Sequence, residues 1–357
     1  MSKIILTGGG TAGHVTPNIA LIPALREAGF TPIYIGSYNG IEKDLITKEG
    51  LEYHGISSGK LRRYFDWKNF SDPFRVLRGY AQARSLLKRI RPAVVFSKGG
   101  FVSVPVVLAA KSLHIPAILH ESDMTPGLAN RIAMKGAVKI CCNFPETLSY
   151  LPEGKGVLTG SPIRQALLHG SRDKALEFTG LTGARPLLLI IGGSLGSVFI
   201  NNAVRGALDD LLRDFEIIHL CGKGNLDPSL DGRSGYVQYE YISKELPDLF
   251  AAADLVISRA GANAICELLA LRKPNILIPL SRNASRGDQI LNAASFAKQG
   301  FSYVIEEEDV TEKTLTDAIR HVTSHRDEYI KAMSDSAQMD PIQKIVAIIK
   351  EAADKQG

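Results

Sequence analysis

Short runs of apolar, mostly β-branched residues recur along the whole chain, and stretches with helical character separate them. The runs lie at residues 3–7, 32–36, 93–97 and 117–120 in the first half, and at residues 187–191, 217–221, 255–258, 276–279 and 303–305 in the second. Buried strands that alternate with helices form βαβ units, whose strands are parallel and whose helices cover both faces of the sheet. The pattern therefore predicts an α/β fold with a doubly wound, Rossmann-like sheet in each half.

The length of the chain agrees with two domains, because its 357 residues exceed the roughly 150 that one domain usually holds. We expect an N-terminal Rossmann-like domain over residues 1–163 and a C-terminal one over residues 164–340. Asp340 and Pro341 provide an N-cap and a first position for a last helix, predicted over residues 340–354. The segment 341–357 is expected to pack back on the N-terminal domain.

Composition excludes several classes of protein. Hydrophobic residues make up 45% of the chain and charged residues 22%, which is typical of globular domains and not of disordered or coiled-coil chains. No apolar run approaches the roughly 20 residues of a membrane-spanning helix and the chain does not start with a signal peptide, so we expect it to stay in the cytoplasm. The four cysteines form no CxxC pair and no metal-ligand spacing, which predicts reduced thiols without a disulfide or a metal site.

Residues 60–91 carry ten basic and two acidic side chains, and aromatic residues that include the only tryptophan lie among them. Such a segment can dock a protein on an anionic membrane surface. A solvated helix with one core face is the simpler explanation of this segment taken alone, and nucleic-acid binding ranks third because no recognised module accompanies the charges. The candidate membrane residues are Arg62, Arg63, Phe65, Trp67, Phe74, Arg75 and Arg78.

Three glycine-rich segments directly follow predicted strands. The first glycine loop is residues 8–13 (GGGTAG), the second is residues 98–101 (KGGF) and the third is residues 192–197 (GGSLGS). Ligands of open parallel sheets bind beyond the carboxyl ends of the strands, where loop amides and helix N-termini receive phosphate oxygens. The three loops therefore predict a diphosphate-bearing ligand on each side of a cleft.

The first glycine loop also matches the dinucleotide fingerprint GxGxxG, so an NAD-dependent dehydrogenase is an alternative. That fingerprint expects an acidic residue at the end of the second strand to bind the ribose, whereas this strand ends in Ile35-Gly36-Ser37. The Walker lysine pattern is missing from the sequence as well. The sequence therefore argues against NAD, and we expect no cofactor.

Several side chains near the predicted strand ends are candidates for chemistry. His14 directly follows the first glycine loop, and an imidazole that titrates near neutrality suits a general base; a helix-start histidine bonded to the backbone is the structural alternative. Asp123 is a second candidate base, whereas Glu121 could pair with a basic neighbour or cap a turn. Glu267 either complements a helix dipole or binds a ribose diol, and Gln289 lies near a polar loop suited to sugar hydroxyls.

Longer motifs resemble one family of proteins. The chain contains, in order, GGGTAGHVTP, SKGGFVSVP, LHESDMTPGLANR, GSPIR, GGSLGS, SRAGANAICELLALRKPNILIPL and GDQILNA, and in these it is similar to the MurG family over nearly its whole length. The resemblance implies the two-domain GT-B fold and a peripheral enzyme on the cytoplasmic face of the cell membrane, without metal or cofactor. It implies transfer of N-acetylglucosamine from UDP-GlcNAc to undecaprenyl-diphosphate-linked MurNAc-pentapeptide. The implied partners are these substrates, the anionic membrane surface and other cell-wall synthesis proteins, but no nucleic acid.

Carried over residue by residue, the resemblance assigns contacts with each substrate. The implied donor-binding residues are Thr11, Ala12, Gly13, Arg164, Ser194, Leu195, Ile242, Ala262, Glu267 and Gln289. The implied acceptor-binding residues are Gly10, Gly99, Gly100 and Asn130. Three positions depart from the family pattern. Leu195 and Asp288 each replace a glutamine, and Asp123 stands where an asparagine is common, which leaves the identity of the base open.

The implied reaction is an inverting single displacement, because the donor sugar is α-linked and the product is β-linked. It needs one base, a stabilised diphosphate leaving group and exclusion of water. We expect His14 to be the base, with Asp123 either orienting it or replacing it. Another GT-B enzyme that acts on a UDP-sugar, such as a lipid glycosyltransferase or UDP-GlcNAc 2-epimerase, and a non-catalytic UDP-sugar sensor are the alternatives.

Overall fold

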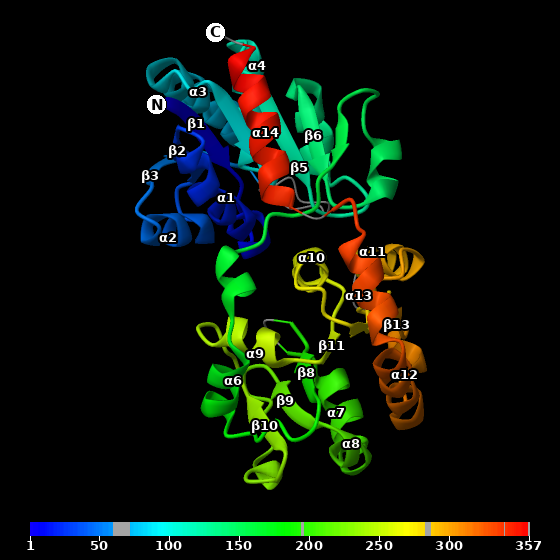
Figure 1. Ribbon diagram of the computed structural model, residues 1–357. Coiled ribbons are helices and arrows are strands. Elements are labelled where there is room, and N and C mark those ends of the chain that lie inside the picture. The colour runs from blue at the N-terminus through cyan, green and yellow to red at the C-terminus, as the bar shows by residue number, and fades with distance from the viewer. Residues whose placement is uncertain (60–71, 194–195, 283–286, 339, 356–357) are drawn as a thin grey trace. The chain divides into compact units, whose positions relative to one another are not determined.

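The computed structural model describes residues 1–59, 72–193, 196–282, 287–338 and 340–355 (Figure 1). The chain forms two compact units, the first made of residues 1–164 and 337–357 and the second of residues 165–336. The second unit thus begins one residue after the expected boundary, and residues 337–340 belong with the first unit. Six residues of the expected sites lie outside the described residues, namely Arg62, Arg63, Phe65, Trp67, Ser194 and Leu195.

Seven parallel strands form the sheet of the first unit over the described residues, in the order β3-β2-β1-β4-β5-β6-β7. They are β1 Ser2–Thr7, β2 Phe30–Ser37, β3 Glu52–Ile56, β4 Val94–Ser97, β5 Ala117–Glu121, β6 Lys139–Cys142 and β7 Gly156–Leu158. The four strands expected in this half are confirmed as β1, β2, β4 and β5. The apolar pattern does not predict the other three, since β3 is a polar, half-exposed edge strand, β6 (KICC) consists of a lysine, one isoleucine and two cysteines, and β7 is only three residues long.

Helices cover both faces of this sheet, as the alternation of strands and helices predicts. They are α1 Thr16–Glu27, α2 Ile41–Lys48, α3 Asp72–Ile90, α4 Ser103–Ser112, α5 Leu128–Ala133 and α14 Pro341–Asp354. Successive residues of β1 point to opposite faces, so Ile4 packs with buried residues of α1 and α14, whereas Ile5 packs with those of α3 and α4. Figure 1 shows α14 beside α1, and the end of the chain therefore completes the core of the first unit.

The last helix begins at Pro341 and has Asp340 at its N-cap, both as the sequence predicts. Asp340 occupies the N-cap position with φ of +58°, and its side chain makes no capping hydrogen bond to the described helix. A capping side chain normally requires extended backbone at the N-cap, and the left-handed conformation of Asp340 does not provide it. The position of the N-cap is thus confirmed, but the side chain of Asp340 does not cap the helix.

Six parallel strands form the sheet of the second unit over the described residues, in the order β10-β9-β8-β11-β12-β13. They are β8 Leu187–Ile191, β9 Glu216–Leu220, β10 Tyr236–Tyr239, β11 Leu255–Ser258, β12 Asn275–Leu277 and β13 Tyr303–Val304. All five strands expected in this half are confirmed. The additional strand, β10, lies at the edge of the sheet and is mostly half-exposed, so it lacks a continuous apolar run.

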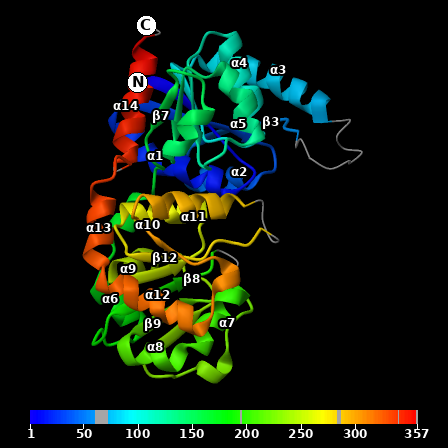
Figure 2. The ribbon, with the colours of Figure 1, turned by 90° about the vertical axis from the view of Figure 1, so that its right-hand side faces the viewer.

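The helices of the second unit also lie on both sides of its sheet. They are α6 Arg172–Thr179, α7 Val198–Gly206, α8 Leu208–Asp214, α9 Leu246–Ala252, α10 Ala262–Ala270, α11 Asp288–Lys298, α12 Glu312–Ser324 and α13 Arg326–Ser334. Helices α7, α8 and α12 share one hydrophobic core with strands β8, β9 and β11 (Figure 2). The second unit thus buries a core of its own.

Strand order places the expected sites at equivalent positions of the two sheets. In the first sheet β1 lies between β2 and β4, and in the second β8 lies between β9 and β11, so the order of strands reverses at β1 and at β8. Ligands of doubly wound sheets bind beyond the carboxyl ends of the strands at this switch point. The three glycine loops follow β1, β4 and β8, and all of them therefore lie at a switch point.

A buried histidine in the second unit predicts a loss of stability in acid. His219 is fully buried on β9, with Nδ1 3.0 Å from the hydroxyl of Tyr236 and Nε2 3.0 Å from Oδ1 of Asn201. Burial, and then the charge of Arg205, lower the pKa of His219 to about 3. In the unfolded chain its pKa is about 6.5, so the unfolded state binds a proton that the folded state does not. The free energy of unfolding therefore falls as the pH is lowered from about 6.5 towards 3.

The His219→Gln variant tests this prediction, because glutamine keeps hydrogen-bonding groups at the position but does not titrate. Denaturant titrations of both proteins between about pH 7 and pH 5 should show a larger loss of unfolding free energy in the wild-type chain. Equal losses in the two proteins would contradict the prediction.

Candidate functional site

The first and second glycine loops touch each other at the carboxyl edge of the first sheet. Gly100 has φ of +85°, and a Cβ atom at this position would overlap the carbonyl oxygen of Gly9. Gly99 has φ of +96° and lies against Asn130, whose amide atoms would be 3.3 Å from such a Cβ. The backbones of the two loops approach this closely only because residue 100 is a glycine. The structure thus brings together three of the expected acceptor residues, Gly99, Gly100 and Asn130.

His14 is the last residue of the short 3-10 helix η1 (Ala12–His14), which follows Thr11 in the first glycine loop. Its Nδ1 atom is 3.1 Å from the hydroxyl of Thr11. Burial, and then the charge of Lys98, lower the pKa of His14, while a backbone hydrogen bond with Gly9 and the charge of Glu42 raise it by less. The pKa lies below its ordinary value, so the imidazole is neutral at pH 7, the form in which it accepts a proton.

A buried lysine at the start of the second glycine loop is a feature that the sequence patterns do not single out. Lys98 is 1% exposed, and its Nζ atom lies 2.7 Å from Nδ1 of His120 and donates to Oγ of Ser122 at 2.5 Å. Nε2 of His120 lies 2.9 Å from the carbonyl oxygen of Gly160. Burial, and then the charge of Lys98, hold the pKa of His120 well below its ordinary range. His120 therefore stays neutral, and Lys98 brings a positive charge to this loop.

The carboxylate of Glu121 organises the loop that follows β5. Glu121 is 4% exposed and accepts hydrogen bonds from Asp123 N at 3.0 Å, Gly127 N at 3.1 Å and Asn130 Nδ2 at 2.8 Å. These contacts support the turn-capping interpretation of Glu121.

The two candidate bases follow strands that are not neighbours in the sheet. His14 follows β1 and Asp123 follows β5, and β4 lies between these two strands, so β1 and β5 are about 10 Å apart.

The described residues of the third glycine loop, 192–193 and 196–197, lie at the carboxyl ends of β8 and β9. Gly193 and Gly196 have φ of +95° and +75°, and a Cβ at Gly196 would overlap the carbonyl oxygen of Cys221, which follows β9. Ser197 ends the loop and caps α7, because its Oγ accepts a hydrogen bond from Ile200 N at 3.3 Å. The loop therefore leads directly into the N-terminus of a helix, as a phosphate site requires.

Arg259 joins this loop to two other loops of the second unit. Its Nη2 donates to Oγ of Ser197 and to Oε1 of Glu307, both at 2.7 Å, and its Nη1 donates to two carbonyl oxygens after β12 at 3.1 and 3.3 Å. The other oxygen of Glu307 accepts from Ser281 N at 2.9 Å. Burial raises the pKa of Glu307, but the hydrogen bonds from Arg259 and Ser281 outweigh it and hold the pKa below its ordinary value. Arg259 thus fixes a positive charge at the carboxyl edge of the second sheet.

Other expected donor residues also follow strands of the second unit. Ile242 is buried after β10, Ala262 begins α10 after β11, and Glu267 is half-buried on the same helix. Gln289 lies in the first turn of α11, and its Oε1 accepts a hydrogen bond from Leu280 N at 3.1 Å, which orients the side-chain amide. Four expected donor residues belong instead to the first unit, namely Thr11, Ala12, Gly13 and Arg164. Contacts of all these residues with a donor remain predictions.

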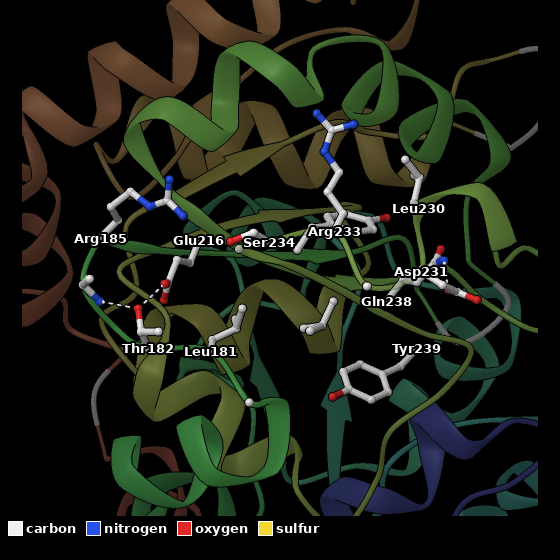
Figure 3. Close-up of a pocket in the computed structure, with 16 residues that line it drawn as sticks. Leu181, Thr182, Arg185, Glu216, Leu230, Asp231, Arg233, Ser234, Gln238 and Tyr239 are labelled. Atoms are coloured by element: carbon white, nitrogen blue, oxygen red, sulfur yellow. Dashed lines mark hydrogen bonds between the residues drawn. The ribbon is translucent and has the colours of Figure 1, made fainter.

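A large pocket of the second unit lies away from these residues (Figure 3). Its volume is about 740 Å³, and it is lined by residues 180–182, residues 184–185, Glu216 and residues 230–239. Glu216 begins β9 and accepts hydrogen bonds from the hydroxyl of Thr182 at 2.5 Å and from Gly183 N at 2.7 Å. The pocket therefore reaches the amino ends of the strands, the opposite edge from the glycine loop, and contains none of the expected site residues.

Three of the expected membrane residues lie on the described part of α3. Phe74 is 75% exposed, Leu77 near it is 66% exposed, and Arg75 and Arg78 are exposed beside them.

Within the described ranges, no helix combines the length and the apolar character needed to cross a membrane. The same residues contain no group of three or more His, Cys, Asp or Glu side chains that could hold a metal ion.

Two family models match the two halves of the chain. The glycosyltransferase family 28 N-terminal domain matches residues 4–142, and the glycosyltransferase family 28 C-terminal domain matches residues 187–349. Together the two models cover most of the chain, including strands of both parallel sheets.

Named proteins are similar to the chain over its whole length. A protein of Lachnospira eligens named UDP-N-acetylglucosamine--N-acetylmuramyl-(pentapeptide) pyrophosphoryl-undecaprenol N-acetylglucosamine transferase is 64% identical over 98% of this chain and 99% of its own. A protein of the same name from Lachnoclostridium phytofermentans is 65% identical with the same coverage. The crystal structure of Acinetobacter baumannii MurG matches with a TM-score of 0.78 at 23% identity, over 98% of this chain and 100% of its own.

Proposed function

This chain belongs to the MurG family of family 28 glycosyltransferases, and we propose that it catalyses the reaction for which its relatives are named. It is a glycosyltransferase with the GT-B fold. The reaction transfers N-acetylglucosamine from UDP-GlcNAc to undecaprenyl-diphosphate-linked N-acetylmuramyl-pentapeptide, which converts lipid I to lipid II in peptidoglycan synthesis. The observation that carries this proposal is the 64% identity with a named transferase over 98% of the chain.

The second unit is the proposed donor site. UDP leaves with additional negative charge on its diphosphate, so the enzyme must place positive charge and N–H donors where that charge develops. The third glycine loop and the N-terminus of α7 supply amide donors, and the Arg259 guanidinium lies 2.7 Å from Ser197 at the end of this loop. Glu267 would bind the ribose and Gln289 the sugar, as the family resemblance implies.

The first unit is the proposed acceptor site, with His14 as the general base. In one tautomer Nδ1–H of His14 donates to the Thr11 hydroxyl, and Nε2 then carries the lone pair that takes the proton from the C4 hydroxyl of MurNAc. The deprotonated oxygen attacks C1 of N-acetylglucosamine from the face opposite UDP, which inverts the anomeric centre. The positive charge of Lys98 stabilises the negative charge of the acceptor diphosphate, which we place at the second glycine loop.

Dependence of UDP release on both substrates tests the proposed function. The purified chain should release UDP from UDP-GlcNAc only when a lipid I analogue is present, and should form one β-linked disaccharide per UDP. Release of UDP without acceptor, together with formation of N-acetylmannosamine, would instead identify a 2-epimerase. Binding of UDP-GlcNAc without turnover on any lipid acceptor would identify a sensor.

The exposed residues of α3 predict binding to the cytoplasmic face of the membrane. Replacing Phe74 and Leu77 with serine, and separately Arg75 and Arg78 with glutamate, should each lower binding to vesicles that contain phosphatidylglycerol by about tenfold or more. Cosedimentation with vesicles measures this binding. Turnover of a water-soluble lipid I analogue should be retained in both variants.

Leu168→Ser is the matched control for the apolar pair, because Leu168 is 44% exposed but lies in the second unit. It should bind vesicles as the wild type does. Unchanged vesicle binding by both α3 variants would remove the described part of α3 from the membrane surface.

A further inference from the structure

The side chain of Glu42 lies against the first glycine loop in the interior of the first unit. Glu42 is in the first turn of α2 and is 1% exposed. Its Oε2 accepts a hydrogen bond from Gly10 N at 3.3 Å, and its Oε1 accepts from Ser37 N at 3.0 Å and from the Ser37 hydroxyl at 2.5 Å. One buried carboxylate thus joins the first glycine loop to the end of β2.

Three glycines leave room for this carboxylate. A Cβ at Gly9 would lie 2.6 Å from Oε1 of Glu42, and a Cβ at Gly36 would lie 2.9 Å from its Cγ. A Cβ at Gly40 would also overlap the carboxylate. The glycine pattern here makes space for a side chain of the protein itself, in addition to any space that it makes for a ligand.

Glu42 also explains how the first glycine loop can match the dinucleotide fingerprint without binding a dinucleotide. In that motif an acidic residue at the end of the second strand binds the ribose of the ligand. Here the acidic residue comes five positions after Ser37, and it accepts hydrogen bonds from the protein's own Gly10 and Ser37. The amide of Gly10 therefore already has an anionic partner, which disfavours a phosphate at the same amide.

The residues held by Glu42 support the rest of the proposed acceptor site. Gly100 of the second glycine loop packs directly on the carbonyl oxygen of Gly9. Thr11 and His14 follow Gly10 within the same short segment, and their side chains are 3.1 Å apart. A shift of the backbone at Gly9 and Gly10 would therefore move both the second glycine loop and the proposed base.

We propose that Glu42 is a positioning residue for the acceptor site, an inference that rests on the proposed function. Its carboxylate sets the conformation of the first glycine loop before any substrate binds, and through this loop it sets the positions of His14 and of the second glycine loop. A buried carboxylate is stable only while its hydrogen-bond donors stay in place, so the loop and the carboxylate hold each other. Reacting groups that the protein already holds in position before the substrate binds lower the entropic cost of the reaction.

The Glu42→Gln variant tests the proposal, because it keeps the shape of the side chain but turns one acceptor oxygen into an N–H donor. We expect kcat/KM for the lipid acceptor to fall by about tenfold to a hundredfold, while the affinity for UDP, whose proposed site lies in the second unit, changes by less than about twofold. Glu49→Gln is the matched control, because Glu49 follows the same helix but is exposed, and it should leave all parameters unchanged. Ser37→Ala removes one donor to the carboxylate and should produce a smaller loss in the same direction.

Two results would overturn this role. One is a Glu42→Gln enzyme with wild-type acceptor kinetics. The other is an equal loss of UDP affinity and of acceptor parameters together with a lower melting temperature, which would show that Glu42 only supports the fold. If Glu42→Gln does not fold, the Ser37→Ala variant decides between the same outcomes.

A readout without turnover separates this proposal from the proposed function. In amide NMR spectra, the Gly10 proton should lie downfield in the wild-type chain and move upfield in Glu42→Gln, as expected when its carboxylate acceptor is lost. A wild-type chain without acceptor-dependent UDP release would contradict the proposed function, and the Gly10 resonance would still test the contact. An unchanged Gly10 resonance would contradict the placement of Glu42.

Discussion

Replacement of His14 with alanine should lower kcat by about two to four orders of magnitude, the usual contribution of a positioned general base. The variant loses the group proposed to remove the proton from the attacking hydroxyl, but it keeps the loops proposed to bind the two diphosphates. Affinity for UDP, measured by calorimetry, should therefore stay within about twofold, since the proposed UDP site lies in the second unit. A steady-state assay with a soluble lipid I analogue measures the loss.

The pH profile gives the same prediction an independent readout. Because burial and Lys98 lower the pKa of His14, the unprotonated base is present at pH 7, and kcat/KM should fall only when the pH drops below 6.5. His169→Ala is the control, because His169 is an exposed histidine of the second unit. Near-normal transfer by His14→Ala, with a large loss in Asp123→Asn, would assign the base to Asp123 instead.

Replacement of Arg259 with methionine should destabilise the second unit by about 3–5 kcal/mol, the usual cost of removing one partner of a buried ion pair. Methionine removes the charge opposite Glu307, and these two side chains are only 10% and 13% exposed. Ser197 and two carbonyl oxygens would also lose their hydrogen-bond donor. Affinity for UDP should fall as well, because the third glycine loop loses its connection to the loops after β12. Denaturant titration and calorimetry measure the two effects.

Two further variants separate the buried charge from a general effect of losing an arginine. Arg320→Met breaks an exposed ion pair with Asp210, and it should change stability by less than about 1 kcal/mol. Adding Glu307→Gln to Arg259→Met should recover part of the lost stability, because the unpaired carboxylate is gone. A stable Arg259→Met protein with wild-type affinity for UDP would contradict the proposed role of this arginine.

The sequence predicts most of the fold because strands of a doubly wound sheet are buried on both faces and appear as continuous apolar runs. Strands β1 and β8 are examples. Strand β3 has the sequence EYHGI and β10 has YVQY, and both lie at sheet edges where one side is partly exposed. These segments become strands because they pair with the neighbouring strands β2 and β9, and not because they contain an apolar run.

The sequence predicts the glycine loops of the candidate sites but not the buried side chains that hold these loops. Glycine loops are local motifs, so their sequence and their position after a strand are visible together. Arg259 contacts Ser197 and Glu307, which are 62 and 48 positions away. Glu42 contacts Gly10 over 32 positions. Spacing along the chain cannot show such contacts, because they arise only when separate strand ends meet at one edge of a sheet.

The position of helix α14 affects how the chain folds during translation. Its residues Ile342, Ile345, Val346 and Ile349 belong to the core of the first unit, whereas the second unit is one continuous stretch, residues 165–336. The ribosome therefore releases every residue of the second unit before the first unit can bury its last core layer. The nascent first unit therefore keeps an uncovered apolar face until α14 has been synthesised, and a chain cut short before α14 should expose that face to chaperones and aggregation.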